Sequence, residues 1–593
     1  MTSAHQEYTN RLETLNARIR KLSRFDLLFS QFRGALFVVF IILLVAAFND
    51  QAAFFWLLAP VLSFVAAAVG HERVIRKREL VRRKAALCER GLARLEDRWA
   101  GGGTQGTQYL DSSHSYSEDL DLFGRGSLFE LLCIARTSAG ESTLAGWLLC
   151  PSRPDQILKR QRAIEELRMQ LDFREDLASE GSEIRNRMHP ETLLKWAEQP
   201  AILFGPAVRV AALVTVFLSL LTPAGWALSW WGHNPFVAVV ILQILLFRKI
   251  GKRAHSITGG AEGAHPELKL LSVMLERIEK QNFQSEYLLD LQSTLKSDLI
   301  QPSVQIKRLG RLIEFLDWQR NQLFAPIAIL LLWEIQIAFA LEKWRRHCGT
   351  RIRSWIGVVG EMEALSSLSC YAYEHPDDPF PEITEESPRF EAVRLGHPLI
   401  PENRSVHNDI QINSTVRMKI VSGSNMSGKS TLLRTIGVNS VLALCGAPVR
   451  AESLRISPLS IGASIHILDS LQSGSSRFYA EITRLRQIMD LALEKPPLLF
   501  LLDEILHGTN SADRLIGAEA IVRGFLDRGA IGLVTTHDLA LTRIADQPGS
   551  SMENIHFQDH IEDGRIAFDY RVHTGVVQKS NAIALMRAVG LDV

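Results

Sequence analysis

The stretch that most constrains the fold is Ile420–Leu433, where an apolar strand pattern runs into a Gly/Ser-rich loop and then a helix pattern. The loop fits G-x-x-x-x-G-K-[ST], whose backbone N–H groups wrap phosphate oxygens while the lysine reaches the outer phosphates and the hydroxyl holds Mg²⁺. An ordinary Gly/Ser turn would not need a strand before it and a helix after it. We therefore predict a nucleotide site at this loop, followed by a helix that begins at Thr431. The positive N-terminal end of that helix favours an anion. The predicted contacts of the loop are Gly423, Ser424, Asn425, Met426, Ser427, Gly428, Lys429, Ser430 and Thr431.

A second apolar run, Pro497–Leu502, ends in the carboxylates Asp503 and Glu504. Its unbroken hydrophobicity is typical of a parallel strand that is buried on both faces. Downstream of a phosphate loop, we expect Asp503 to assist Mg²⁺ and Glu504 to orient or deprotonate the attacking water. The ordinary alternative for such a dipeptide is an acidic pair on the surface at a strand end.

A third apolar run, Ala530–Thr536, leads to His537. Ligands of open α/β sheets collect at the carboxyl ends of the strands, so we expect His537 to lie at the same edge and sense the γ-phosphate. Strand and helix patterns alternate over residues 381–593, which predicts an α/β domain of the P-loop NTPase class. The predicted catalytic residues are Lys429, Glu504 and His537, and the predicted Mg²⁺ ligands are Ser430 and Asp503.

Length, charge and cysteine content limit the function classes. A chain of 593 residues exceeds the size of one hydrophobic core, so we expect several domains. Lys and Arg number 66 against 65 Asp and Glu, so an electrostatic partner must be met by a local patch. The six cysteines are scattered without any C-x-x-C motif, which indicates reduced, buried thiols.

The hydrophobic residues are concentrated in two regions. Between Gly34 and Gly70 the only charged residue is Asp50, which divides the stretch into two apolar segments. One bilayer crossing needs about 20 apolar residues, so residues 34–70 are predicted to form a transmembrane hairpin. A buried helical hairpin of a soluble core is the alternative.

The second region, Val210–Phe247, contains no Asp, Glu, Lys or Arg and is interrupted by turn residues. We predict a second transmembrane hairpin over residues 201–250. A further apolar stretch, Ala325–Leu341, contains Glu334 and Gln336. Because an ionised Glu is costly in lipid, this stretch is predicted to be a buried helix.

Basic segments follow both apolar regions, at His71–Lys84 and Arg248–Arg253. Basic flanks stay cytoplasmic, so four crossings would place the N-terminus and the nucleotide site on the cytosolic side of a cytoplasmic (inner) membrane. The same clusters could instead bind anionic lipid or nucleic acid.

The remaining segments complete the predicted organisation. Residues 1–33 are polar with apolar positions at helical spacing, which indicates an amphipathic helix before the membrane. Residues 71–108 combine a basic helix with a flexible linker at Gly101–Gly106. Helical patterns dominate the two parts of a core domain at 109–200 and 251–380, and the nucleotide domain occupies 381–593. The predicted fold class is thus transmembrane α-hairpins, a mostly α core and a C-terminal α/β domain.

Several pieces together resemble the ATPase domain of the MutS mismatch-repair family. Their order and spacing match at once, which is more specific than any one motif, and the resemblance covers roughly residues 120–200 and 350–593. The similar pieces are Leu395-Gly-His-Pro398, His407-Asn-Asp-Ile410, Ser424–Thr431, Ser473-Gly-Ser-Ser-Arg-Phe-Tyr-Ala-Glu481, Asp503-Glu-Ile-Leu-His-Gly-Thr509 and Thr535-Thr-His537.

The resemblance implies an ATP hydrolase that uses ATP and Mg²⁺ and works as a homodimer sandwiching two nucleotides. The turn at Asn408-Asp409 would lie against the adenine, and Ser476 would reach in trans to the γ-phosphate bound by the opposite subunit. Asp513 and the C-terminal residues 580–593 would help to hold the dimer together. The family also implies DNA as a partner.

Departures from the family leave three functional classes open. Membrane hairpins occupy the place of the mismatch-reading domain, Leu506 and His507 replace the usual Gly-Arg, and Ser427 stands where glycine is common. The first class is a membrane-tethered MutS-like ATPase that acts on DNA. The second is an ABC-type membrane ATPase that transports a substrate. The third is a membrane ATPase that remodels a protein or lipid partner without DNA.

Overall fold

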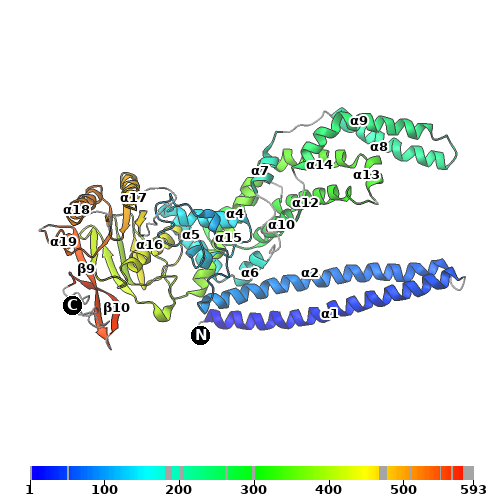
Figure 1. Ribbon diagram of the computed structural model, residues 1–593. Coiled ribbons are helices and arrows are strands. Elements are labelled where there is room, and N and C mark those ends of the chain that lie inside the picture. Colours follow the sequence, from blue (N-terminus) through cyan, green and yellow to red (C-terminus); the bar gives the residue numbers. More distant parts are fainter. Residues whose placement is uncertain are drawn as a thin grey trace.

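The computed structural model describes residues 3–49, 53–179, 190–200, 206–260, 265–296, 301–322, 324–465, 477–506, 510–547, 549–562 and 565–577. A sheet domain lies at one end of the molecule and a helical core lies beside it (Figure 1). Two helical hairpins, α1–α2 and α8–α9, reach away from the sheet domain toward the other end (Figure 1). The predicted division into a helical part and a C-terminal α/β part is confirmed.

The first hairpin is longer than its apolar part. α1 (Ser3–Phe48) and α2 (Leu58–Leu95) pack antiparallel, with the short helix η1 (Phe54–Leu57) between them. The 46 residues of α1 span roughly 70 Å at about 1.5 Å per residue, more than twice a hydrocarbon core of about 30 Å. The predicted amphipathic helix, the first apolar pair and the basic helix are therefore parts of one continuous hairpin.

The glycine run that follows is folded. Gly101 and Gly103 donate their backbone N–H groups to Glu130 Oε1 at 2.9 and 3.0 Å, and Gly126 donates to Glu130 Oε2 at 2.7 Å. A Cβ on Gly106 would come within 2.7 Å of the Phe129 ring. This stretch is a packed turn and differs from the flexible linker that its composition indicated.

The helical core is built around α15 (Ile352–Glu374), whose residues are almost all buried. α4, α5, α10 and α11 all contact α15, which explains its uniform hydrophobicity. Its other helices are η2 (Thr107–Tyr109), α3 (Leu128–Leu132), α4 (Ser138–Leu149), α5 (Pro154–Arg168), α6 (Leu171–Ser179), α7 (Pro190–Glu198), α10 (His265–Lys280), α11 (Glu286–Lys296) and α12 (Pro302–Trp318).

The second hairpin consists of α8 (Pro206–Ala227) and α9 (Asn234–Gly259). The stretch predicted to be one buried helix beside it is broken, because α13 (Ala325–Leu330) ends and α14 (Trp333–Cys348) begins after Leu332 with φ +46°. α14 is largely buried, whereas Ile329 of α13 is exposed. The prediction was therefore wrong for its first half.

The main sheet of the C-terminal domain has six described strands in the order β10-β9-β4-β8-β7-β6. All neighbouring pairs are parallel except β10 and β9, which are antiparallel. β4, β8 and β7 are adjacent, so the segments after these strands meet at one edge. The bounds are β4 (Met418–Ser422), β6 (Ser460–Ser464), β7 (Leu498–Leu502), β8 (Ile531–Thr536), β9 (Met552–Glu562) and β10 (Arg565–Thr574).

Helices cover both faces of this sheet. α16 (Lys429–Cys445) is buried between one face of the sheet and the core helices α4 and α5. The opposite face packs against α17 (Arg477–Leu491), α18 (Ser511–Asp527) and α19 (Leu539–Thr542). A smaller sheet has the order β1-β5-β2-β3 and stands beside the site with the short helix η3 (Glu402–Arg404). Its strands are β1 (Glu382–Ile383), β2 (Phe390–Leu395), β3 (Asn408–Ile412) and β5 (Ser453–Ile456).

Candidate nucleotide site

The phosphate loop connects β4 to α16 in a backbone conformation that glycine permits. Gly423 has φ +151° and Gly428 has φ +104°, and Met426 also has a positive φ of +68°. α16 begins at Lys429, two residues before the predicted start. Lys429 Nζ donates to the carbonyl oxygens of Gly423 and Ser424, each at 2.9 Å. The lysine therefore lies within the loop that it was predicted to serve.

Two polar side chains of the loop are buried without a hydrogen-bond partner, namely Ser424 Oγ and Ser427 Oγ. Buried hydroxyls without partners are costly and call for an explanation. A phosphate group would accept from both hydroxyls and from the backbone N–H groups at the start of α16. The residues of this loop fit a nucleoside triphosphate.

The carboxylates after β7 reach the loop after β4 across β8, which lies between these two strands. Ser430 Oγ donates to Asp503 Oδ2 at 2.5 Å, which places a hydroxyl and a carboxylate together as Mg²⁺ ligands require. Lys429 Nζ lies 3.6 Å from Glu504 Oε1, and His537 Nε2 lies 2.9 Å from Glu504 Oε2. The predicted catalytic residues Lys429, Glu504 and His537 are therefore in direct contact.

The turn that carries Glu504 is strained. Glu504 has φ +47° and Leu506 has φ +60°, conformations that non-glycine residues rarely adopt and that cluster at functional sites. Burial lowers the pKa of the Lys429 ammonium, and the nearby carboxylates Glu504 and Asp503 oppose that shift. The lysine can therefore be buried as a cation because two carboxylates accompany it.

A cavity of about 490 Å³ lies beside the loop and is lined by Leu395, His397, Asn408, Thr431, Phe557 and Tyr570 among others. The predicted turn at Asn408-Asp409 is instead the start of β3. Asn408 lines the cavity and is fixed by bonds to the Tyr570 carbonyl (3.0 Å) and the Val572 N–H (2.8 Å). Asp409 is exposed and accepts from the Arg394 N–H at 2.8 Å, so the structure does not bring Asp409 into the cavity.

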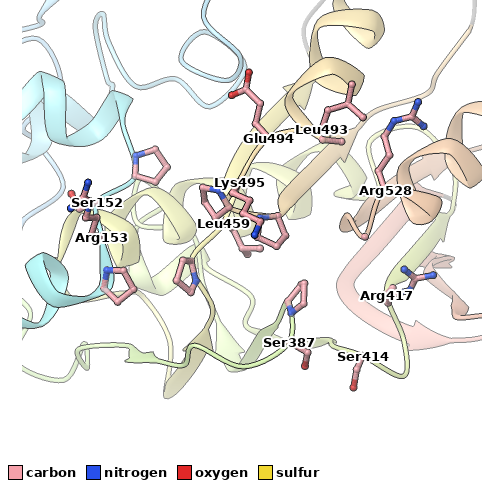
Figure 2. Close-up of a pocket in the computed structure, with 18 residues that line it drawn as sticks. Ser152, Arg153, Ser387, Ser414, Arg417, Leu459, Leu493, Glu494, Lys495 and Arg528 are labelled. Atoms are coloured by element: carbon pink, nitrogen blue, oxygen red, sulfur yellow. The ribbon is translucent and has the colours of Figure 1, made fainter.

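A larger cavity of about 880 Å³ contains none of the predicted site residues (Figure 2). Arg417, which precedes β4, and Pro497, which precedes β7, both line it. It therefore lies at the amino edge of the parallel strands, whereas ligands of such sheets collect at the carboxyl edge. Size alone does not identify the site.

Comparison with known proteins bears on this region. Residues 419–592 match the family described as MutS domain V. Residues 419–592 therefore carry a domain of the MutS domain V type.

Curated relatives agree with this family. The DNA mismatch repair protein MutS 2 of Halobacterium salinarum is 32% identical over 266 residues, which is 44% of this chain and 30% of that protein. The DNA mismatch repair protein MutS of Exiguobacterium sp. is 38% identical over 236 residues, which is 38% of this chain and 27% of that protein. The Endonuclease MutS2 of Thermus thermophilus is 33% identical over 204 residues, 34% of this chain and 26% of that protein. The matched part thus spans less than a third of each relative.

Two residues of the MutS domain were missed by sequence reasoning. The Thr535 hydroxyl donates to Asp503 Oδ1 and accepts from the Glu504 N–H at 3.0 Å, so it holds the Asp503 carboxylate and the Glu504 backbone in place. Glu481 is buried and accepts from the Leu506 N–H, which joins α17 to the acidic turn. Each belongs to a motif quoted for the resemblance, but only the fold reveals these contacts.

Some predicted residues lie outside the described part of the MutS domain. Ser476, His507 and residues 580–593 are among them. Asp513 is described at the start of α18, where its N–H donates to the Asn510 side chain at 2.9 Å.

The 490 Å³ cavity beside the phosphate loop is lined by His397, whose pKa is shifted. Burial, with a smaller effect of Arg434, lowers the pKa of His397 to about 4, and its Nδ1 accepts from the Leu399 N–H at 3.1 Å. Because the folded domain disfavours the proton, the stability contributed by neutral His397 is complete above pH 6.5 and is lost as the pH falls toward 4. We expect the Tm of the domain to fall over this range and His397→Asn to flatten that part of the profile. An unchanged slope in the variant would assign the effect to other groups.

Proposed function

We propose that the chain is a membrane-anchored MutS-type ATPase that hydrolyses ATP in a dimer and couples this turnover to DNA. The observation that carries the ATPase assignment is the contact of Glu504 with both Lys429 (3.6 Å) and His537 (2.9 Å) at the carboxyl ends of β7, β4 and β8. A carboxylate between a phosphate-loop lysine and a histidine is suited to act on a water beside the γ-phosphate.

Each residue of the proposed site has a distinct role. Lys429 and the loop N–H groups bind and orient the β- and γ-phosphates, and Ser430 with Asp503 holds the metal. Mg²⁺ supplies charge neutralisation at the phosphate oxygens when it is bound. Glu504 accepts the proton of the attacking water, and His537 holds the Glu504 carboxylate in position. Thr535 fixes both acidic residues through its hydroxyl.

Exposed apolar side chains of the phosphate loop, α17 and α18 support a dimer. Met426 of the phosphate loop, Tyr479 of α17 and Ile516 of α18 are all largely exposed. Large exposed apolar side chains are enriched where proteins associate. We propose that a second copy covers them and brings Ser476 in trans to the nucleotide, with Asp513 at the interface.

The hairpins support the membrane part of the proposal. Four described helices are long and apolar enough to cross a membrane, and most residues of their apolar windows are exposed. On the first hairpin, exposed apolar side chains run from Phe25 to Val69. Six exposed cations without an ion pair in the described part of the chain lie just outside these limits, at Arg18, Arg20, Lys21, Arg24, Arg73 and Lys77. Asp26 and Arg33, near the start of this range, both contact His71 at the other end of the hairpin's apolar part. This order fits a lipid-facing region over residues 34–70 bounded by cytosolic headgroups, with the N-terminus and the ATPase domain cytosolic.

The substrate is the least constrained part of the proposal. Two of the relatives are named DNA mismatch repair proteins and one an endonuclease, which supports DNA as the partner. The four apolar helices fit equally a second candidate, an ABC-type membrane ATPase that transports or remodels a protein or lipid partner without DNA.

One experiment separates the two candidates. The ATPase rate of the detergent-purified full chain is measured without DNA and with duplex, branched or mismatched DNA at moderate salt. We expect DNA to bind and to change turnover. ATP turnover that no DNA alters, together with no binding, would overturn the DNA part and favour the second candidate. Absence of any ATPase activity would overturn the enzyme assignment itself.

A further inference from the structure

The short helix α13 ends beside the second hairpin in a broken turn. Its last residue is Leu330, Leu332 takes a left-handed conformation, and α14 starts only at Trp333. A break of this kind leaves carbonyl groups without intrahelical N–H partners, and such groups must be satisfied elsewhere.

Side chains of the hairpin satisfy the Leu330 carbonyl. Ser219 Oγ of α8 donates to it at 3.0 Å, and Gln243 Nε2 of α9 donates to it at 2.9 Å. Gln243 is only 4% exposed and also donates to the Thr215 carbonyl at 3.3 Å. A buried amide within an apolar helix is costly unless it is bonded. Here it binds the backbone of the broken helix.

These bonds define the level of α13 along the hairpin. The uncharged part of the hairpin lies between Arg209 and Arg248. Ser219 follows Arg209 by ten residues and Gln243 precedes Arg248 by five, so at about 1.5 Å per residue they lie roughly 15 and 8 Å inside these cations. The end of α13 is therefore level with the apolar part of α8 and α9.

The outer surface of α13 is apolar as well. The segment Phe324–Trp333 has no charged residue. Ile329 is 72% exposed and Ile327 is 48% exposed, and their helix α13 contacts α8, where Leu220 is also exposed. Irregular backbone is tolerated at membrane depth only where neighbouring groups satisfy it, which the bonds to the Leu330 carbonyl do.

The charged residue Glu334, which argues against a membrane position for this stretch, lies away from the apolar part of the hairpin. Glu334 Oε1 is 3.1 Å from His255 Nδ1 and accepts from Thr258 Oγ1 at 3.1 Å. Both partners follow Arg248 on α9 and lie on the polar side of the hairpin. The chain thus returns from the apolar level of Leu330 to the polar level of Glu334 within one short turn.

We propose that α13 is a re-entrant segment whose Ile327 and Ile329 contact the acyl chains of the bilayer beside α8 and α9. The inference rests on the proposed membrane anchoring and adds to it a fifth lipid-contacting element that does not cross. The occupant is lipid hydrocarbon because the exposed surface of α13 continues that of the hairpin.

Fluorescence quenching in vesicles of phosphatidylcholine and phosphatidylglycerol tests this placement. Cys150 is exposed, so the prediction of buried thiols is wrong for this one of the six cysteines. The full chain carrying Cys150→Ser, which removes this thiol, receives one new cysteine for an environment-sensitive dye. The test site is Ile329→Cys. Leu220→Cys on α8 is the control for lipid contact, and Met169→Cys, 71% exposed after α5, is the control for water contact. Quenchers are a nitroxide on the lipid acyl chain and aqueous iodide.

We expect the nitroxide to quench the dye at 329 as strongly as at 220 and several-fold more than at 169, with iodide showing the reverse order. If 329 behaves like 169 while 220 is quenched by lipid, α13 lies outside the bilayer, covered by water or a second copy. That result overturns this proposal and leaves the anchoring intact. If neither 220 nor 329 is quenched by lipid, the anchoring fails and this inference falls with it.

Discussion

Glu504→Gln is expected to lower ATP turnover by roughly 10²–10⁴-fold, the usual contribution of a general base. The amide keeps the size of the side chain but accepts no proton from water. ATP binding should persist, because Lys429 and the loop N–H groups are unchanged. The steady-state ATPase rate and the affinity for a fluorescent ATP analogue measure the two effects separately.

A matched control for this variant is Glu519→Gln, which removes a carboxylate from α18 that pairs with Arg523 at 2.7 Å. Its turnover should equal that of the unmodified chain. Unaltered turnover in Glu504→Gln would remove Glu504 from the mechanism. Loss of ATP binding in the same variant would show instead that Glu504 is needed to hold Lys429, its neighbour at 3.6 Å.

The sequence predicts the carboxyl edge of the main sheet well, because strands that are buried on both faces must be composed of apolar residues. The strand before Asp503 is fully buried, and the rule that ligands collect at carboxyl ends predicts that Lys429, Glu504 and His537 meet. The role of Thr535 could not be predicted, because a threonine at a strand end carries no signal until its neighbouring strand is known.

Boundaries inferred from composition were less reliable. α1 passes from polar to apolar residues without interruption, because a helix backbone is satisfied in water and in lipid alike. The break at Leu332 carries no glycine or proline signal, since the bonds to Ser219 and Gln243 that stabilise it come from distant segments. Long-range hydrogen bonds of this kind are not visible in local sequence.

Arg94→Ala is expected to weaken the attachment of the first hairpin to the core. Arg94 near the end of α2 binds Glu374 at the end of α15 through two bonds of 2.7 and 2.6 Å, and the Tyr8 hydroxyl of α1 donates to the same carboxylate at 3.1 Å. Glu374 is fully buried, so removing its partner leaves a buried charge unpaired. Breaking such a pair costs about 3–5 kcal/mol.

Hydrogen exchange in detergent measures this effect locally. Amides at the end of α15 should exchange roughly 10²-fold faster or more, at about 1.4 kcal/mol per tenfold change. Arg353→Ala is the control, because Arg353 also makes two bonds to a carboxylate, Glu198, but in solvent, and should change exchange little. In Arg94→Lys the exchange rate at the end of α15 should lie between those of the unmodified chain and Arg94→Ala, because lysine keeps the charge but loses the forked geometry of the guanidinium.

The position of the Arg94–Glu374 pair gives Arg94→Ala a second expected effect. Tyr371 lies on α15 one turn before Glu374, and its hydroxyl donates to Asp378 at 3.0 Å. Asp378 pairs with Arg450 at 3.2 Å, and the Arg450 N–H donates to Asn439 of α16 at 2.8 Å. α16 carries Lys429 at its start, so this series joins the hairpin to the phosphate loop. In Arg94→Ala, any change of ATP turnover between detergent and bilayer should therefore diminish, while basal turnover persists because no catalytic side chain is altered. If exchange at α15 stays slow in the variant, other contacts hold the hairpin and this pair does not couple the two ends.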